Sequence, residues 1–368
     1  MSSIAYFISD YGYGHASRSI AIIRSLLECD LEISFEVHTS KPLNFVKKSL
    51  MLNNESNRVS FHKQLNDLGF IGEKITGKIN YQDTAKLIHP WVQNWGSTYL
   101  FEEYRYLKSR KIDLIVSDIA PQPFLLAKRL QIPSIAISNF TWCDFYQHSS
   151  FRSEDIDIIW KAYREASLGL LLPFNLENTV FPSILETALV SRNPQRQKAQ
   201  MYELLDIDPS TQVIYTGTGI SMNNPFRQEW LDNTDAIFIL GSHSKIEARN
   251  IRTIPSDEHE SQDFIACSDL ALIKLGYSSI SEAIRSHIPI IGVDFAKTPE
   301  TKFMAKQVQE LGIGICITSQ EYFDGDWLKY IPEVLEMRQN YSQLPERFRS
   351  RGESQIANII LTILEETC

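Results

Sequence analysis

The chain has 368 residues, of which 43% are hydrophobic and 22% are charged. This composition is typical of a folded globular protein and excludes a disordered or fibrous one. The length predicts two domains of roughly 150–200 residues each. The formal net charge of −9 argues against nucleic acid as the main partner, because proteins that bind phosphate backbones carry clustered Lys and Arg.

The five cysteines are scattered along the chain, a pattern that gives neither a disulfide framework nor a zinc site. No apolar run approaches the roughly 18–20 residues of a membrane span, and the first residues lack the pattern of a signal peptide. We therefore expect a cytoplasmic protein without a membrane span. Residues 41–52 mix apolar side chains with three lysines, which fits either a solvated helix face or contact with an anionic membrane surface.

The chain opens with a strand, a glycine-rich turn, a helix and a second strand. Residues 4–8 are apolar and lead into Ser-Asp-Tyr-Gly-Tyr-Gly-His-Ala-Ser-Arg; helical spacing follows, and residues 33–37 form the next apolar run. Gly12 and Gly14 allow a ligand to approach the backbone closely, and Gly14 is expected to contact the nucleotide-sugar donor. Ser17 stands where a dinucleotide motif needs its third glycine, and no acidic residue ends the second strand. A nicotinamide cofactor is therefore not expected.

His15 follows that turn, where its imidazole would face a crevice and could act as a general base. Its alternative role is to brace the loop. Residues 112–116 form another strand, which ends in Ser-Asp, so Asp118 lies at the carboxyl tip of a parallel strand on the same side of the sheet. A carboxylate there could orient the imidazole, or it could cap the helix expected at residues 124–130.

A second strand–turn–helix–strand unit runs from residue 269 to residue 295, with the turn Lys-Leu-Gly-Tyr-Ser-Ser. Gly276 permits a sharp turn, and Ser278 or Ser279 is expected to supply the N-cap oxygen. The free N–H groups of the first helical turn, with Lys274 beside them, would then bind a phosphate or diphosphate. Glu282, one turn further on, could reach a sugar diol. The alternative is that these residues form only a turn and a cap.

The rest of the chain fits the same scheme. Residues 182–200 are polar and contain prolines, so we expect a linker there. Residues 213–219 then form a strand with a glycine turn, whose Gly217, Thr218 and Gly219 could lie against the diphosphate. Two Asp-x-Asp triplets, beginning at Asp155 and Asp206, follow no strand tip; we interpret them as charges on helix surfaces and expect no obligatory metal.

Three stretches resemble glycosyltransferases of the GT-B fold: GYGHASR, SDIAPQPFLLAKRLQIPSIAISNFTW and SDLALIKLGYSSISEAIRSHIPIIGVDF. They are similar to the bacterial peptidoglycan N-acetylglucosaminyltransferase and to plant UDP-glycosyltransferases. The strongest likeness is to the glycosyltransferase-like N-terminal domain of plant L-arabinokinase. The plant enzymes' long signature box, with its Trp and His-x-Gly-x-Asn, is absent, and Lys-Leu-Gly-Tyr stands in its place.

This resemblance implies two Rossmann-like α/β domains that face a central cleft. The expected domains are 1–185, which would bind the acceptor, 186–350, which would bind the nucleotide sugar, and a C-terminal helix, 351–368, which would return to the first domain. Among matched positions, His15 would deprotonate the acceptor and Asp118 would pair with it. Ser278 and Ser279 would contact the diphosphate, and Glu282 the ribose. Glu300 is a looser match to a residue that holds the donor sugar.

The expected activity is therefore inverting, metal-independent transfer of a sugar from a nucleoside diphosphate, with UDP favoured, to a hydroxyl of a small molecule, lipid or glycan. No cofactor is expected besides the donor. Two alternatives stay open. One is a nucleotide-sugar hydrolase, and the other is a non-catalytic domain that binds a nucleotide sugar.

Overall fold

The computed structural model describes residues 2–51, 57–72, 79–176, 180–218, 226–227, 230–231 and 234–367. The chain divides into two compact units. Within the described residues, unit 1 contains the chain up to Ile71, the stretch Ile79–Val190, and the chain from Ser350 onward; Ser191–Arg349 belongs to unit 2. Gly219, which we expected near the diphosphate, lies outside the described residues.

Unit 1 is built on a parallel sheet whose strands lie in the order β3-β2-β1-β4-β5-β6-β7. The strands are β1 (Ser2–Ile8), β2 (Ile33–Thr39), β3 (Val59–Lys63), β4 (Leu114–Asp118), β5 (Ser134–Ser138), β6 (Leu168–Leu171) and β7 (Ile184–Glu186). The central strands are buried on both faces, as near-continuous apolar runs require in a parallel sheet. The order reverses direction between β1 and β4, and such a switch point is where open α/β sheets bind ligands.

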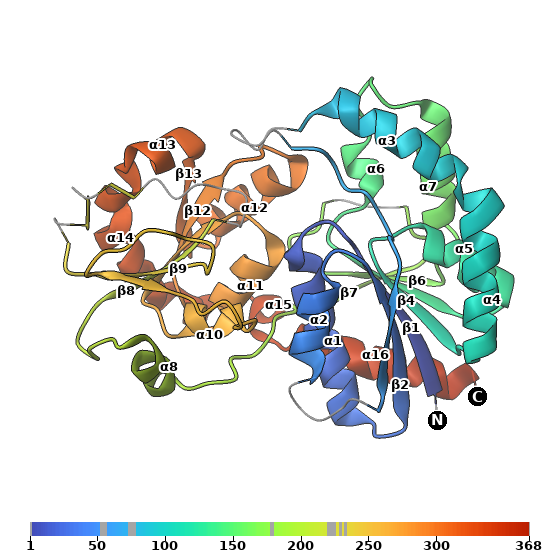
Figure 1. Ribbon diagram of the computed structural model, residues 1–368, viewed down its shortest axis with the longest axis horizontal. Coiled ribbons are helices and arrows are strands. Elements are labelled where there is room, and N and C mark those ends of the chain that lie inside the picture. Colours follow the sequence, from blue (N-terminus) through green and yellow to red (C-terminus); the bar gives the residue numbers. More distant parts are fainter. Residues whose placement is uncertain are drawn as a thin grey trace. The chain divides into compact units, whose positions relative to one another are not determined.

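Helices cover both faces of this sheet (Figure 1). They are α1 (Tyr13–Cys29), α2 (Leu43–Met51), α3 (Tyr81–Gln93), α4 (Leu100–Arg110), α5 (Gln122–Leu130), α6 (Trp142–Phe145), α7 (Ser153–Tyr163) and α16 (Gly352–Thr367), with a π-helical turn, η1 (Trp95–Tyr99), before α4. Phe7 of β1 packs in an apolar cluster with Leu107 of α4 and Leu126 of α5. The neighbouring Tyr6 faces Ser19 of α1, because successive side chains of a strand point to opposite faces.

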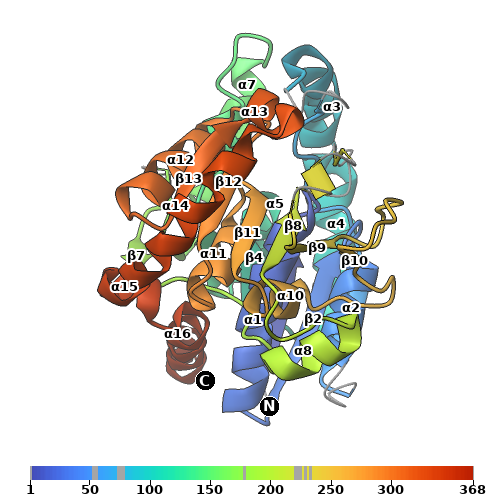
Figure 2. The ribbon, with the colours of Figure 1, turned by 90° about the vertical axis from the view of Figure 1, so that its left-hand side faces the viewer.

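The C-terminal helix α16 packs on α1 within unit 1, and Figure 2 shows the two helices next to each other. The Ser25 hydroxyl of α1 lies 3.5 Å from that of Ser354. Gly352 donates its N–H to the carbonyl of Leu189, and a Cβ at Gly352 would lie 2.1 Å from the Ala188 carbonyl oxygen. The close approach of these two backbones therefore requires glycine at this position.

Unit 2 repeats the pattern with a parallel sheet in the order β10-β9-β8-β11-β12-β13. The strands are β8 (Val213–Gly217), β9 (Ile237–Leu240), β10 (Ile251–Thr253), β11 (Leu270–Lys274), β12 (Ile290–Asp294) and β13 (Gly314–Thr318). Its helices are α8 (Lys198–Leu205), α10 (Ser261–Ala266), α11 (Tyr277–Arg285), α12 (Pro299–Glu310), α13 (Ser319–Asp324), α14 (Ile331–Glu336) and α15 (Glu346–Arg349), with 3₁₀ turns η2 (Asp326–Tyr330) and η3 (Met337–Gln343). The switch point here lies between β8 and β11.

The chain passes from unit 1 to unit 2 between Val190 and Ser191, within the linker predicted at 182–200. This segment is not all linker: it contains β7, which pairs with β6 in parallel through Leu170 and Leu185, and its last residues begin α8. β3 pairs with β2 in a stretch where no strand was predicted. No helix in the described part of the chain combines the length and the apolarity needed to cross a lipid bilayer.

Candidate functional site

In unit 1, the candidate catalytic residues lie at the switch point of the sheet. The turn between β1 and α1 contains Gly12, whose φ of 77° is in the left-handed region that favours glycine. His15 is the third residue of α1, and Asp118 is the last residue of β4. Because β1 and β4 are neighbours in the sheet, their carboxyl ends bring the two side chains together.

His15 and Asp118 are in direct contact. The imidazole Nδ1 lies 2.8 Å from Oδ1 of Asp118, and both residues are buried. Asp118 does not cap α5: that helix has Pro121 at its N-cap position, and the carboxylate accepts hydrogen bonds from α1 instead. Arg18 NH2 also lies 2.9 Å from this Nδ1. In the tautomer whose Nδ1–H donates to the carboxylate, Nε2 is the ring nitrogen that can accept a proton.

Arg18, one turn after His15 on α1, is a member of this site that sequence reasoning did not assign. Its guanidinium donates to Asp118 through Nε at 2.7 Å and NH2 at 2.6 Å, and also donates to the Asn139 side chain. Burial of the Asp118 carboxyl acts to raise its pKa, but the charges of Arg18 and His15 outweigh burial and lower the pKa to about 2. Asp118 is therefore ionised throughout the neutral range. The i, i+3 spacing of His15 and Arg18 on a helix is the signal that could have found this residue.

The backbone is strained directly after β4, and hydrogen bonds hold it in this conformation. Ile119 has a φ of 54°, which is unusual for a β-branched residue and costs about 1–3 kcal/mol. Tyr163 donates its hydroxyl to the Ile119 carbonyl at 2.6 Å, and Ser117 donates to the Ala120 carbonyl at 2.8 Å. These bonds hold the chain in its turn directly after Asp118.

A second buried carboxylate, Asp67, lies near this site and was also not foreseen. Its oxygens accept the backbone N–H of Asp10 at 2.9 Å and the indole N–H of Trp142 at 3.1 Å. Burial and the charge of Asp10 raise the pKa of Asp67 to about 6, while the charge of His15 acts against this rise. Asp67 thus adds a negative charge close to His15 once the pH exceeds about 6.

This raised pKa makes a testable contribution to stability. An acid whose pKa is about 6 when folded and 3.8 when unfolded stabilises the fold fully below pH 3.8, and this contribution is lost as the pH rises through 6. Two pKa units correspond to about 3 kcal/mol. Asp67→Asn should therefore gain stability relative to the parent by up to about that amount between pH 4 and pH 7, measured by urea unfolding at both values. A stability difference that does not change with pH would contradict the raised pKa.

In unit 2, most of the predicted donor residues gather at the switch point. Gly217 ends β8 and pairs with Ile273 of β11, so Thr218, which follows β8, and Lys274, which ends β11, lie at neighbouring strand ends. The Lys274 residue has exposed surface, but the protein around its ammonium shields it from water and lowers its pKa, and the Glu300 carboxylate of α12 acts against this decrease. Thr218 is buried and accepts a hydrogen bond from the Tyr322 hydroxyl at 3.3 Å.

The start of α11 differs from expectation. The helix begins at Tyr277 with Gly276 as N-cap, so Ser278 and Ser279 lie inside the first turn and neither is the cap residue. A serine would be the usual cap, but Gly276 leaves that position without a side chain. A Cβ at Gly276 would meet no atom within 4 Å, so the space beside the helix N-terminus is open to a ligand. The first-turn amides can still bind an anion.

Two predicted donor residues do not lie at this open helix end. Gly14 is the second residue of α1 and belongs to unit 1 with His15. Glu282 is buried in α11, where its Oε1 accepts hydrogen bonds from Arg192 Nε at 2.9 Å and NH2 at 2.8 Å. Glu282 is therefore part of an ion pair that no local sequence pattern indicates, and a sugar diol would have to share its carboxylate with Arg192.

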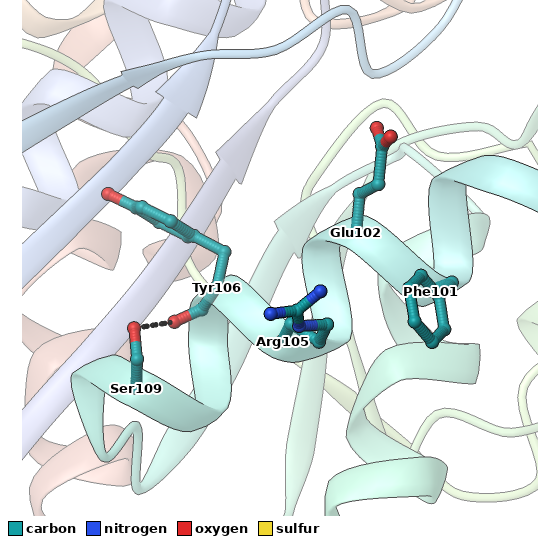
Figure 3. A pocket seen from close by; sticks show the side chains of 5 residues that line it. All are labelled: Phe101, Glu102, Arg105, Tyr106 and Ser109. Carbon is teal, nitrogen blue, oxygen red and sulfur yellow. Dashed lines mark hydrogen bonds between the residues drawn. The ribbon is translucent and has the colours of Figure 1, made fainter.

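Other candidate features are not part of these sites. Asp155 was expected on a helix surface, but it is buried in α7 and lies 3.0 Å from Nδ1 of His89, whereas Asp206 is exposed after α8. The surface hollow in Figure 3 lies on α4 and contains none of the predicted site residues. Its lining residues are Phe101, Glu102, Arg105, Tyr106 and Ser109.

Comparisons with known proteins agree with this architecture. No family model matches the chain. Solved structures of GT-B glycosyltransferases superpose on nearly its whole length. The calicheamicin glycosyltransferase CalG4 has a TM-score of 0.63 and 16% sequence identity, and the match covers 99% of this chain and 98% of that one. The spinosyn rhamnosyltransferase SpnG has a TM-score of 0.68 and 12% identity, with 99% and 100% of the two chains covered; Phytolacca americana UGT2 with UDP-2-fluoro-glucose and pterostilbene has a TM-score of 0.66 and 12% identity, with the same coverage. The chain therefore has the GT-B fold.

Among curated proteins, L-arabinokinase of Arabidopsis thaliana is 24% identical over 358 residues. The match takes in 92% of this chain but only 32% of that protein, so the chain spans about a third of the length of the relative it matches. The similarity thus concerns one part of a larger protein.

Proposed function

We propose that this protein is an inverting, metal-independent glycosyltransferase that moves a sugar from a nucleoside diphosphate to a hydroxyl acceptor. The favoured nucleoside diphosphate is UDP. The observation that carries the proposal is the 2.8 Å contact between His15 Nδ1 and Asp118, at the switch point of a sheet in a GT-B fold. The transferases among its structural neighbours, one of them bound to a UDP-sugar analogue, support the donor class.

In the proposed reaction, His15 takes the proton of the acceptor. With Asp118 holding Nδ1, Nε2 takes the proton of the acceptor hydroxyl while that oxygen attacks C1 of the sugar. The bond between C1 and the phosphate oxygen breaks, and its electron pair leaves with the diphosphate. A single displacement of this kind inverts the configuration at C1. Asp118, ionised at neutral pH, stabilises the imidazolium that forms.

The leaving diphosphate gains negative charge, and unit 2 offers groups that stabilise it. The first-turn amides of α11, the hydroxyls of Ser278 and Ser279, and the Lys274 ammonium would bind it electrostatically. Gly217 and Thr218 would contact the same group from the neighbouring strand, Glu300 would contact the donor sugar, and Glu282 the ribose. The amides, the hydroxyls and the Lys274 ammonium would stabilise this charge without a metal ion.

The experiment that tests the proposal is a turnover assay. Nucleotide sugars are first ranked by thermal shift, and the best donor is incubated with a panel of hydroxyl acceptors, with and without Mg²⁺. The expected result is equimolar UDP and glycosylated acceptor, with inverted configuration at C1 by NMR and no need for Mg²⁺. UDP and free sugar alone would instead support a hydrolase, and binding without turnover would support a non-catalytic domain.

Lys274 provides a separate test of the donor site. Lys274→Met should weaken binding of UDP by roughly 10–100-fold, because a hydrogen bond to a charged group is worth about 1.5–3 kcal/mol. The measurement is isothermal titration with UDP. The matched control is Lys306→Met, which removes an exposed lysine of α12 that pairs with Glu310 and should bind UDP like the parent. Unchanged UDP affinity in Lys274→Met would remove Lys274 from the proposed site.

A further inference from the structure

Three side chains of unit 1 that the proposed function does not use converge between the sheet and α4. His38 of β2 and His62 of β3 are register partners on adjacent parallel strands, so they project from the same face of the sheet. Glu103 of α4 lies against both: its Oε1 is 3.1 Å from His62 Nε2, and its Oε2 is 3.5 Å from His38 Nδ1. One ligand atom from each of the three residues lies within 4.8 Å of the other two.

The polar atoms of this cluster are incompletely bonded. His38 is completely buried, and neither of its ring nitrogens has a hydrogen-bond partner within the described residues; the same holds for Oε2 of Glu103. Leaving such atoms unsatisfied in a protein interior is costly. A ligand bound between the two side chains would satisfy one ring nitrogen of His38 and Oε2 of Glu103.

Charge in the cluster points in the same direction. Glu103 is buried, and the two imidazoles lie against its carboxylate. The nearby Glu36 is engaged by Arg110 at 3.2 Å and by the Tyr106 hydroxyl at 2.8 Å.

The side chains are also held in place before any ligand arrives. The His38 ring stacks on Phe7 at a centroid distance of 4.2 Å, and the His62 ring stacks on Tyr106 at 4.0 Å. His62 is the most accessible member, with 27% of its side chain exposed. It therefore offers an entry path from the surface.

We propose that His38, His62 and Glu103 bind one divalent transition-metal ion, with zinc as the preferred ion. Two imidazoles and one carboxylate form a common set of zinc ligands. Ligand atoms about 2.0–2.2 Å from tetrahedral zinc lie roughly 3.3–3.5 Å apart, which small side-chain movements can reach from the present distances. The ion would join β2, β3 and α4. This role is independent of the proposed transfer reaction, which uses other residues of the unit.

The test is titration of the metal-depleted full chain with Zn²⁺ by calorimetry, and with Co²⁺ as a probe whose visible absorption reports its coordination. The expected result is one saturable site and the absorption of four-coordinate Co²⁺ with nitrogen and oxygen ligands. His62→Gln and Glu103→Gln should each weaken Zn²⁺ binding by more than about 100-fold. Even the loss of a residue that only hydrogen-bonds to a metal ligand lowers metal affinity by about 10–100-fold.

The matched control is His89→Gln. His89 also lies in unit 1 and also contacts a buried carboxylate, Asp155, at 3.0 Å, but it belongs to no cluster of three ligands among the described residues. The His89→Gln variant should bind Zn²⁺ with the same affinity as the parent. Circular dichroism verifies that each variant is folded, and Zn²⁺ should raise the melting temperature of the parent and of His89→Gln but not of His62→Gln. Absence of saturable binding, or equal affinity in parent and His62→Gln, would overturn the proposal.

Discussion

Replacing His15 with alanine is expected to lower the rate of sugar transfer by roughly 10²–10⁴-fold, the usual contribution of a general base. Without the imidazole, the acceptor hydroxyl must lose its proton to water while its oxygen attacks the sugar. Affinity for UDP should stay within about twofold, because His15 belongs to unit 1 and the residues proposed to hold the diphosphate belong to unit 2. The measurements are single-turnover kinetics at saturating donor and calorimetry with UDP.

The control separates loss of the base from damage to unit 1. His89→Ala removes a histidine that also pairs with a buried aspartate and should leave the transfer rate within about twofold, as expected for a side chain outside the reaction. Asp118→Asn should also lower the rate, since it leaves the imidazole without a charged partner. If His15→Ala retains the parent rate, His15 only braces the turn, and the proposed mechanism is wrong.

The sheets could be predicted from the sequence because parallel strands buried on both faces have a continuous apolar signature. The strands predicted at 4–8, 33–37 and 112–116 are β1, β2 and β4, whose bounds differ from the predicted ones by at most two residues. The turn at Gly12 could be predicted because turns that need a positive φ favour glycine, so the residue type itself indicates the turn. Such signals are local, and a single sequence contains them.

Elements whose stability depends on neighbours could not be predicted in this way. β3 alternates partly exposed polar and apolar residues, and β7 is an exposed edge strand of three residues. Pairing with β2 and β6 stabilises them, and no local pattern encodes that pairing. The N-cap of α11 was misplaced for a related reason. Serine is the usual cap, yet the helix begins earlier, at a glycine beside open space.

The same limit applies to the candidate sites. His15 and Asp118 follow glycine turns and strand tips, so topology alone predicts that they meet. Arg18 follows His15 by one helical turn, so its spacing could also have indicated it. Asp67 reaches this site only through the packing of the fold, and Arg192 reaches Glu282 across 90 residues of sequence. Long-range partners of buried charges are visible only once the fold is known.

The pair between Arg192 and Glu282 gives the largest stability effect that we expect in unit 2. The Arg192 guanidinium also donates to the His259 carbonyl at 3.0 Å and to the Ser261 hydroxyl at 2.7 Å, so it joins the start of the unit to α10 and α11. Arg192→Met leaves Glu282 buried without its cation, and breaking a buried pair in this way costs about 3–5 kcal/mol. Urea unfolding at pH 7 measures the loss, and Lys306→Met, at an exposed pair, should change stability by less than about 1 kcal/mol.

The pH dependence of this loss identifies its cause. Burial raises the pKa of Glu282 above 4.5, and Arg192 partly offsets the rise; without Arg192 the pKa is higher still. An acid with a raised pKa in the folded state destabilises the fold progressively as the pH rises above 4.5, so the deficit of Arg192→Met should shrink from pH 7 toward pH 4.5. The double variant Arg192→Met/Glu282→Gln has no carboxylate at this position, so its deficit should not grow as the pH rises. Because the parent keeps the raised pKa of Glu282, the deficit of the double variant should instead fall slightly from pH 4.5 to pH 7. A deficit in Arg192→Met that is equally large at both pH values would show that lost packing, and not an unpaired carboxylate, destabilises the unit.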